Sequence, residues 1–333
     1  MKFSFSSSIA GSLLSAALAT SAFAQVSNFD SLNGYAAGLE ARVAGNREAL
    51  FRTPAVTNLA GLTVGGQYTD REIDAARDRI ERDTQAHSLS LSYGWKVGEW
   101  VVGVGVAFDS SSSDYTEVNS PAPTPLHGAV DSDTWSAQIW TGGNLGAIAM
   151  QAAVGFGRGE HDGSRVSDIG SSTASFDSDD VFFRLQFSYD HAVSEGLLLQ
   201  PFAGFASIKA DADGFTEIGT APDRRIVSDF SARETMGNLG VRLAGRQGTW
   251  IPSATVAWLR EFSSNETTLG ISAINNTPIG SGVVPNTGKS FFFASVRLDG
   301  RLQDGWTIGT EVNHLSGGDE KQWGLQLAIT KSF

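Results

Sequence analysis

Apolar and polar side chains alternate along segments of this chain that are too long for the strands of an ordinary soluble sheet. The clearest segment is HSLSLSYGWKV, residues 87–97, where every second residue from Leu89 to Val97 is aliphatic or aromatic. A side-chain period of two indicates a β-strand. Strands of soluble proteins usually have about five or six residues, whereas a tilted strand needs about 9–11 to cross a bilayer. The pattern therefore favours strands that span a membrane.

Twelve alternating segments run through the chain, and the connections between them alternate in length. The segments are roughly 58–70, 85–97, 99–110, 131–142, 144–157, 178–190, 196–210, 230–245, 249–262, 289–299, 303–314 and 321–333. Short connections follow the even-numbered segments, whereas long polar loops such as 109–125 and 266–282 follow the odd-numbered ones. Transmembrane barrels have short turns at one end and long loops at the other. The sequence therefore predicts an all-β fold, a transmembrane up-and-down antiparallel β-barrel of about twelve strands.

The chain ends in GLQLAITKSF, a strand pattern that stops on an aromatic residue without a polar tail. In water, an apolar terminal strand frays or aggregates. In a closed barrel the same strand pairs with the first strand, and its apolar face meets lipid. Aromatic residues near the segment ends fit the girdle found at membrane interfaces; they are Tyr93, Trp95, Trp100, Trp306 and Trp323.

The first residues have the pattern of a secretory signal peptide, which we assign to 1–24. Lys2 is followed by an apolar, serine-rich stretch, and Ala22-Phe23-Ala24 forms an A-x-A cleavage pattern before Gln25. The alternative, an N-terminal membrane anchor, is disfavoured because the apolar core is too short to span a bilayer as a helix. We therefore expect the mature chain to be exported.

Composition excludes several other functions. The chain has no cysteine, which rules out disulfide scaffolds, thiolate metal sites and cysteine catalysis. Its formal net charge of −12, without clusters of Lys and Arg, argues against nucleic acid as a partner.

Residues 25–57 form a separate N-terminal segment, followed by the barrel domain at 58–333. Within this segment, Leu32, Tyr35, Leu39 and Val43 are spaced by three and four residues, which predicts a helix over 31–51. Such a helix would be about as long as a bilayer core is thick, so it could plug the lumen. An exposed leader is the alternative. A second charged stretch, Asp70–Arg82, is either a loop helix or a continuation of the first strand.

Several motifs in order resemble the autotransporter β-domain, the twelve-stranded translocator of type V secretion. The stretches are SYGWKVGEWVVGVGVAF (92–108), LLLQPFAGFASIKADADGFTE (197–217), MGNLGVRLAG (236–245) and PSATVAWLREF (252–262). The resemblance covers 58–333 and implies a barrel in the outer membrane of a Gram-negative cell. It also implies that GLQLAITKSF is read by the outer-membrane assembly machinery, through Leu325, Leu327, Ile329 and Phe333.

The sequence departs from this family at three places. The stretch between Gln25 and the first strand is too short for a large secreted passenger, so we expect none. Arg260 stands where the family often has His, and Lys331 replaces the usual aromatic residue near the end. A lysine at the membrane interface can extend its charged end into water.

The residues Glu217, Arg242 and Glu261 match polar positions of the family, and alternation places Arg184 on the inside with them. Charged residues buried among strands need partners. We therefore predict a structural network in the lumen that grips the 31–51 segment. Lining a channel is the alternative role, and catalysis is the third.

No catalytic, cofactor or metal site is expected, and we do not expect an enzyme. His127 and His161 are predicted to lie in long loops, and His191 in a turn. The acids Asp177, Asp179, Asp180, Asp211 and Asp213 lack EF-hand spacing and are assigned to hydrated external loops.

Expected partners are outer-membrane lipid and the assembly machinery. We predict a passenger-free autotransporter-like barrel with a structural or transport role; a porin-like diffusion channel and a surface protein acting through its loops are the alternatives.

Overall fold

The structure, a computed structural model, describes Tyr35 and most of the chain from residue 60 onward. The described ranges are 60–74, 81–117, 126–167, 170–220, 224–245, 248–265, 267–274, 278–284, 290–318 and 320–333. The predicted signal peptide at 1–24 and, apart from Tyr35, the predicted plug helix at 31–51 lie outside the described residues. Among the helices of the described part, none is long and apolar enough to cross a membrane.

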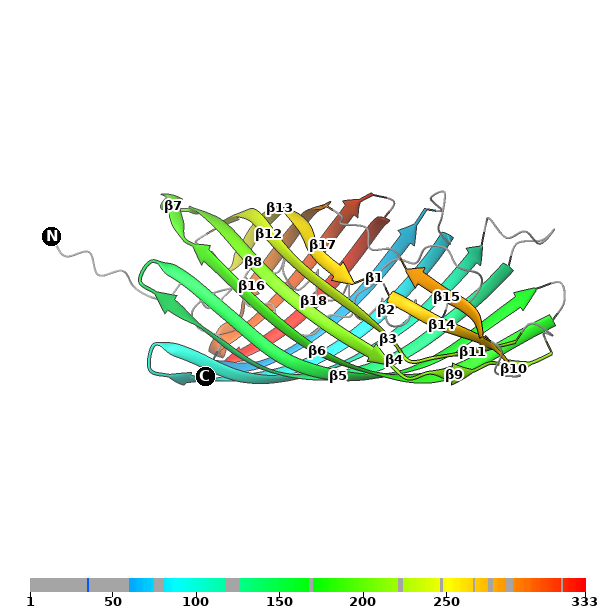
Figure 1. Cartoon of the computed structure of the whole chain (residues 1–333). Helices are drawn as coiled ribbons and strands as arrows, with labels where there is room; N and C mark the ends of the chain where they lie inside the picture. The colour runs from blue at the N-terminus through cyan, green and yellow to red at the C-terminus, as the bar shows by residue number, and fades with distance from the viewer. Residues whose placement is uncertain are drawn as a thin grey trace.

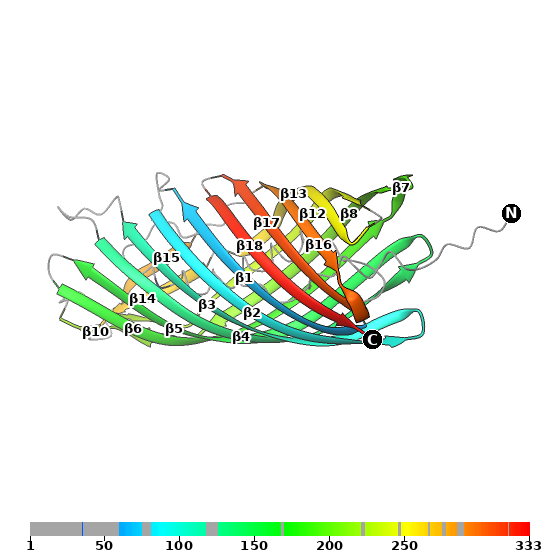
Figure 2. The ribbon, with the colours of Figure 1, turned by 180° about the vertical axis from the view of Figure 1, so that it is seen from behind.

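Twelve of the described strands form one closed antiparallel barrel (Figures 1 and 2). They are β1 (Gly61–Ile73), β2 (Glu81–Val97), β3 (Trp100–Glu117), β4 (Leu126–Leu145), β5 (Ile148–Ser167), β6 (Gly170–Tyr189), β8 (Leu197–Ala212), β12 (Phe230–Gly245), β13 (Trp250–Asn265), β16 (Ser290–Arg301), β17 (Trp306–Gly317) and β18 (Glu320–Ser332). Each pairs with the next in the chain, and β1 pairs with β18 from Gly61↔Ser332 to Ile73↔Glu320. The predicted all-β barrel is therefore confirmed.

Short elements complete the described part. At the end of the barrel where Gly61 and Ser332 pair, which we call the terminal end, lie β7 (His191–Ser194) and the 3-10 turn η3 (Gln303–Gly305). At the opposite end, the mouth, β10 (Ile218–Gly219) pairs with β6. There, β9 (Phe215–Thr216), β11 (Arg225–Val227), β14 (Thr267–Ala273) and β15 (Pro278–Val284) form a small four-stranded sheet.

The barrel distributes its side chains in the reverse of a soluble protein, with apolar groups outside and polar groups inside. Large apolar side chains on alternate positions are exposed; examples are Leu89, Leu91, Val104, Val106, Ile139, Val154, Val181, Leu239, Val296, Leu325 and Leu327. The positions between them face the lumen and bury polar groups; examples are Gln138, Gln151, Gln186, Gln200, Arg297, Asp299, Glu311 and Gln326. Transmembrane barrels show this arrangement because lipid surrounds them and polar groups fill the inside. The outward side chains therefore form the lipid-facing surface.

The apolar outer surface stops at a definite level along the strands. On β3 the outward positions are aliphatic or aromatic from Trp100 to Phe108, and Ser110, Ser112 and Asp114 follow on the same face. The same change occurs on β5 between Phe156 and Arg158, and these two pair with Val181 and Asp179 of β6. The apolar stretch on β3 thus has about the length, 9–11 residues, that a tilted strand needs to cross a bilayer.

Strands β2 to β6 continue far beyond this apolar band, and we call their extensions the wall. The wall comprises residues 81–87, 109–117, 126–134, 157–167 and 170–180. Strands β4, β5 and β6 each have 20 residues, whereas β16 and β17 have 12. Figures 1 and 2 accordingly show β4 to β6 reaching furthest at the mouth. The mouth is therefore high on one side and low on the other.

The wall corrects the prediction that long polar loops follow the odd-numbered strands. The segment 109–125 is strand up to Glu117, and residues 168–169 alone separate β5 from β6. Serine, glycine and aspartate in these segments suggested loops, but each strand extends a ladder already formed in the membrane. Asp70–Ile73 likewise continues β1, as one of the two alternatives proposed. The stretch 266–282 contains β14 and most of β15, apart from the residues that the structure does not describe.

Glycines on the inner surface provide slots for aromatic rings. A Cβ added at Gly103 would lie 2.2 Å from the Trp140 ring, and one at Gly155 would lie 2.3 Å from the Phe182 ring. Both pairs join neighbouring strands, where an aromatic side chain covers the bare glycine backbone. The glycines therefore allow inward aromatic rings to lie flat against the sheet.

We predict that a charge is tolerated outside the apolar band but not within it. Val104→Arg, in the middle of the band on β3, is expected to lower the free energy of unfolding in lipid vesicles by about 2–4 kcal/mol. Ser112→Arg, on the same strand and face but in the wall, is the matched control, for which we expect little change. Urea titration monitored by tryptophan fluorescence measures both, and equal losses would contradict the assigned membrane level.

Candidate functional site

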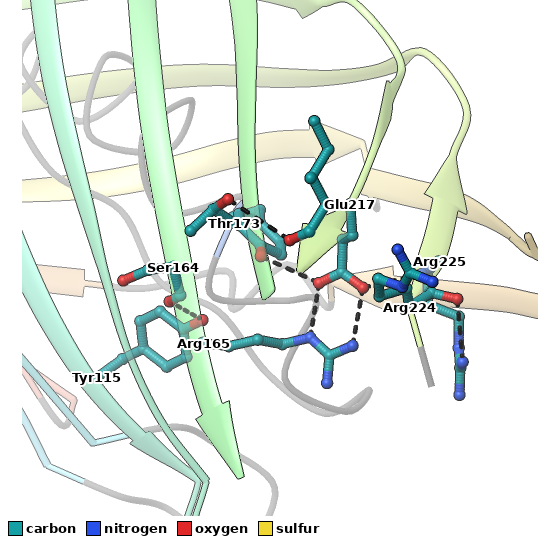
Figure 3. Close-up of polar contacts among 9 residues, drawn as sticks. Tyr115, Ser164, Arg165, Thr173, Glu217, Arg224 and Arg225 are labelled. Carbon is teal, nitrogen blue, oxygen red and sulfur yellow. Dashed lines mark hydrogen bonds and ion pairs between the residues drawn. The ribbon is translucent and has the colours of Figure 1, made fainter. Parts of the chain in front are cut away.

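A buried ion pair joins the wall to the small sheet at the mouth. Glu217 lies between β9 and β10 and is 1% exposed, and Arg165 of β5 is 2% exposed. Arg165 donates from Nε to Oε1 of Glu217 at 2.6 Å and from Nη2 to Oε2 at 2.7 Å (Figure 3). The backbone N–H of Arg225 donates to Oε2 at 2.8 Å. Bidentate hydrogen bonds between a guanidinium and a carboxylate, as here, are among the strong hydrogen bonds of proteins.

Local pairing explains why these two charges meet. On β5, His161, Gly163 and Arg165 occupy inward-facing positions, whereas Asp162 and Ser164 between them lie on the opposite face of the strand. The backbone N–H of Glu217 donates to the carbonyl of Arg225 at 2.9 Å, which fixes the carboxylate beside β11. The inward-facing position of Arg165 on β5 and the pairing of β9 with β11 therefore bring the two charges together.

Tyr35 is the one described residue of the N-terminal segment, and it lies inside this site with 1% of its surface exposed. Its hydroxyl donates to Oε1 of Glu217 at 3.0 Å. Its ring meets Phe215 edge-on at 5.0 Å and covers Gly163, where an added Cβ would lie 2.3 Å from the ring. Burial, and next the charge of Glu217, raises the pKa of the Tyr35 phenol. The phenol therefore remains a protonated donor.

An aromatic cluster surrounds the ion pair. Phe176 stacks on Phe215 at 5.1 Å and on His161 at 4.8 Å. The two ring nitrogens of His161 are hydrogen-bonded to Ser132 at 2.9 Å and Ser178 at 2.8 Å. His161 lies on β5 and is 1% exposed, so the prediction that it lies in a loop is wrong, as it is for His127 on β4. The mouth is thus packed with aromatic groups around one charged pair.

A second charged cluster lies deeper in the lumen, toward the terminal end. Arg297 of β16 donates from Nε to both carboxylate oxygens of Asp299 at 2.9 Å, and its Nη1 lies 3.6 Å from Glu311 of β17. Arg242 of β12 donates to Ser253 at 2.7 Å, and its Nη2 lies 4.0 Å from Asp299. Two arginines and two acids balance one another here, as buried charges require.

The four residues predicted to form one network are all buried, but they belong to different places. Glu217 lies at the mouth with Arg165, whereas Arg242 lies three residues from the terminal end of β12. Arg184 donates to Gln138 and lies 4.7 Å above the Phe182 ring. Glu261 is 6% exposed on β13. The structure therefore gives Glu217 and Arg242 separate partners at opposite ends of the barrel.

Sequence reasoning missed Arg165, because the segment around it was assigned to a loop. Arg165 lies two and four residues after Gly163 and His161, so strand alternation places all three on one face, and this was the signal that could have found it. Asp177, Asp179 and Asp180 belong to β6 and Asp211 to β8, and Asp180 is buried. The described part of the chain contains no group of three or more His, Cys, Asp or Glu placed to hold a metal ion.

Comparison with models of known protein families identifies the family of this barrel. Residues 62–313 match the model of the Autotransporter beta-domain. The chain belongs to the autotransporter β-domain family. The resemblance seen in its motifs is thereby confirmed. The autotransporter β-domain family is a family of translocators, not of enzymes. No curated protein sequence matches the chain.

Solved structures share the fold of this autotransporter barrel. The translocator domain of the autotransporter NalP from Neisseria meningitidis superposes with a TM-score of 0.61 at 13% identity, over 82% of this chain and 89% of that one. The β-domain of the Bordetella autotransporter BrkA gives 0.59 at 16% identity, over 82% and 100%. The Pseudomonas putida toluene transporter TodX gives 0.52 at 11% identity, over 95% and 99%. At these identities the similarity shows the fold alone.

We predict that breaking the pair of Arg165 and Glu217 destabilises the barrel strongly. Arg165→Ala leaves a buried carboxylate without its main partner, which typically costs roughly 3–5 kcal/mol. The matched control is Arg158→Ala on the same strand. Arg158 pairs with Asp177 at 2.7 Å, but the two side chains are 52% and 43% exposed. Exposed pairs contribute little, so the urea midpoint of this control is expected to stay unchanged. Equal midpoints for the two variants would contradict the assignment.

Proposed function

We propose that this chain is an outer-membrane translocator-type barrel whose N-terminal segment, residues 25–57, occupies the lumen and closes it. Residues 1–24 direct export of the chain as a signal peptide and are then removed. The segment remains attached to β1, so the closing element and the pore belong to one polypeptide. No enzymatic step is part of this proposal.

One observation carries the proposal: the described residues on either side of 36–59 lie at opposite ends of the barrel. Tyr35 is buried inside the mouth, whereas Ala60 and Gly61 lie at the terminal end, where β1 begins. The covalent chain between them has to bridge the length of the barrel. The lumen offers the direct route between these points.

The inner surface gives independent support. Leu259, Phe291 and Phe293 face inward in one apolar cluster and are 0–1% exposed. Side chains fill the interior of a barrel of about eight strands, and a twelve-stranded barrel is wider. Apolar groups in its lumen therefore need a covering element. The apolar positions of the N-terminal segment, among them Leu39 and Val43, are suited to that role.

The last strand is proposed to carry the assembly signal of the barrel. Leu325, Leu327 and Ile329 are 41–49% exposed on the outer face of β18, and Phe333 is 79% exposed. Before β18 pairs with β1, this apolar face and its unpaired backbone are accessible to the outer-membrane assembly machinery. After closure the same face contacts lipid, so recognition and membrane anchoring use one set of residues.

Conductance tests the proposed function directly. In planar bilayers the mature chain beginning at Gln25 is expected to be closed, and deletion of 25–55 is expected to open a stable pore. The electrophoretic shift of folded barrels on heating verifies that both variants are folded. Arg158→Ala, which alters the wall but not the lumen, serves as the closed control.

Two outcomes would contradict closure by the N-terminal segment. An intact chain that already conducts as well as the deletion variant would favour the porin-like diffusion channel. A deletion variant that stays closed while folded would show that other residues seal the barrel. A protein acting through its surface would instead lose ligand binding when the β14–β15 hairpin is trimmed, with conductance unaffected.

A further inference from the structure

We propose that the mouth of the barrel contains a binding socket for small phenols, which Tyr35 of the same chain occupies. The ligand class is a ring with one hydroxyl opposite a short alkyl group, since p-cresol is the tyrosine side chain without its backbone. The socket itself does not depend on the proposed function. Its effect on conductance rests on the closing role of the N-terminal segment.

The flat side of the socket is built for an aromatic ring. Gly163 of β5 presents bare backbone to the Tyr35 ring, because a Cβ there would lie 2.3 Å from two ring carbons. Phe215 meets the same ring edge-on at 5.0 Å, a favourable geometry for aromatic pairs. Tyr115, Val130 and Ala174 belong to the same buried cluster. These groups select a planar apolar ring.

The polar end of the socket selects a hydroxyl. Glu217 already accepts two hydrogen bonds from Arg165 and one from the Arg225 backbone, and the Tyr35 hydroxyl supplies the fourth. An ionised carboxylate has about four acceptor positions. A ring without a hydroxyl would leave one position of a buried carboxylate without a partner, which is costly. The socket therefore discriminates phenols from hydrocarbons such as toluene.

Removal of the tyrosine side chain should leave this socket intact and vacant. Cavities made by truncating a buried side chain bind molecules of the shape removed, as an engineered apolar cavity binds benzene. In the unaltered chain, Tyr35 competes as a tethered ligand with a high effective concentration. Tyr35→Ala is therefore expected to bind p-cresol much more tightly than the unaltered chain does.

Calorimetric titration of the refolded mature chain carrying Tyr35→Ala tests the socket, with p-cresol and toluene as the probes. We expect p-cresol to bind at least about tenfold more tightly than toluene, because its hydroxyl bonds to a charged acceptor. Adding Gly163→Val is expected to abolish binding by filling the slot. Ser164→Val, which introduces valine at the next residue, is the matched control and is expected to leave binding unchanged.

Three results would overturn the socket: no p-cresol binding by Tyr35→Ala, equal binding of p-cresol and toluene, or unchanged binding after Gly163→Val. Conductance then separates the socket from the proposed function. We expect Tyr35→Ala to open intermittently and p-cresol to change its open fraction. Binding of p-cresol without any effect on conductance would support the socket and overturn the closing role of the N-terminal segment.

Discussion

The need to pair every backbone polar group inside the bilayer determines this structure. Lipid offers no hydrogen-bond partner to an exposed sheet edge, so the sheet has to close on itself. Closure here depends on β1 and β18, which pair along all 13 residues of each from Gly61↔Ser332 to Ile73↔Glu320. The closed barrel then separates two surfaces. Apolar side chains turn outward to lipid, and the polar and charged ones have to find partners within the lumen.

The charges inside the barrel illustrate how those partners are found. Arg165 and Glu217 meet at the mouth, while Arg297 and Asp299 meet toward the terminal end. Each site pairs charges of opposite sign, which a low-dielectric interior demands. The mouth site differs from the deeper one because a phenol from the N-terminal segment completes it. The same carboxylate therefore joins the wall, the small sheet and the segment before the barrel.

The sequence predicted the barrel well because period-two alternation is a local property. Twelve strands, their order and the lipid-facing residues of β2, β3 and β18 follow from it, and the burial of Glu217 and Arg242 was expected. The wall was missed because serine, glycine and aspartate favour loops when no neighbouring ladder is considered. The sequence analysis expected Glu217 to help hold the 31–51 segment, but the choice of Tyr35 as its partner joins residues 182 positions apart and has no local signal.

Strict alternation also limits how such a chain can change in length. One residue inserted within a strand would turn every following side chain to the other face, moving charges such as Arg297 into lipid. Insertions or deletions of two residues preserve the faces. A single extra residue is tolerated only at a β-bulge, as on β13, where Phe262 has no partner between the pairs Thr235↔Ser263 and Met236↔Glu261. Strands of this barrel are therefore expected to tolerate changes in length in steps of two residues.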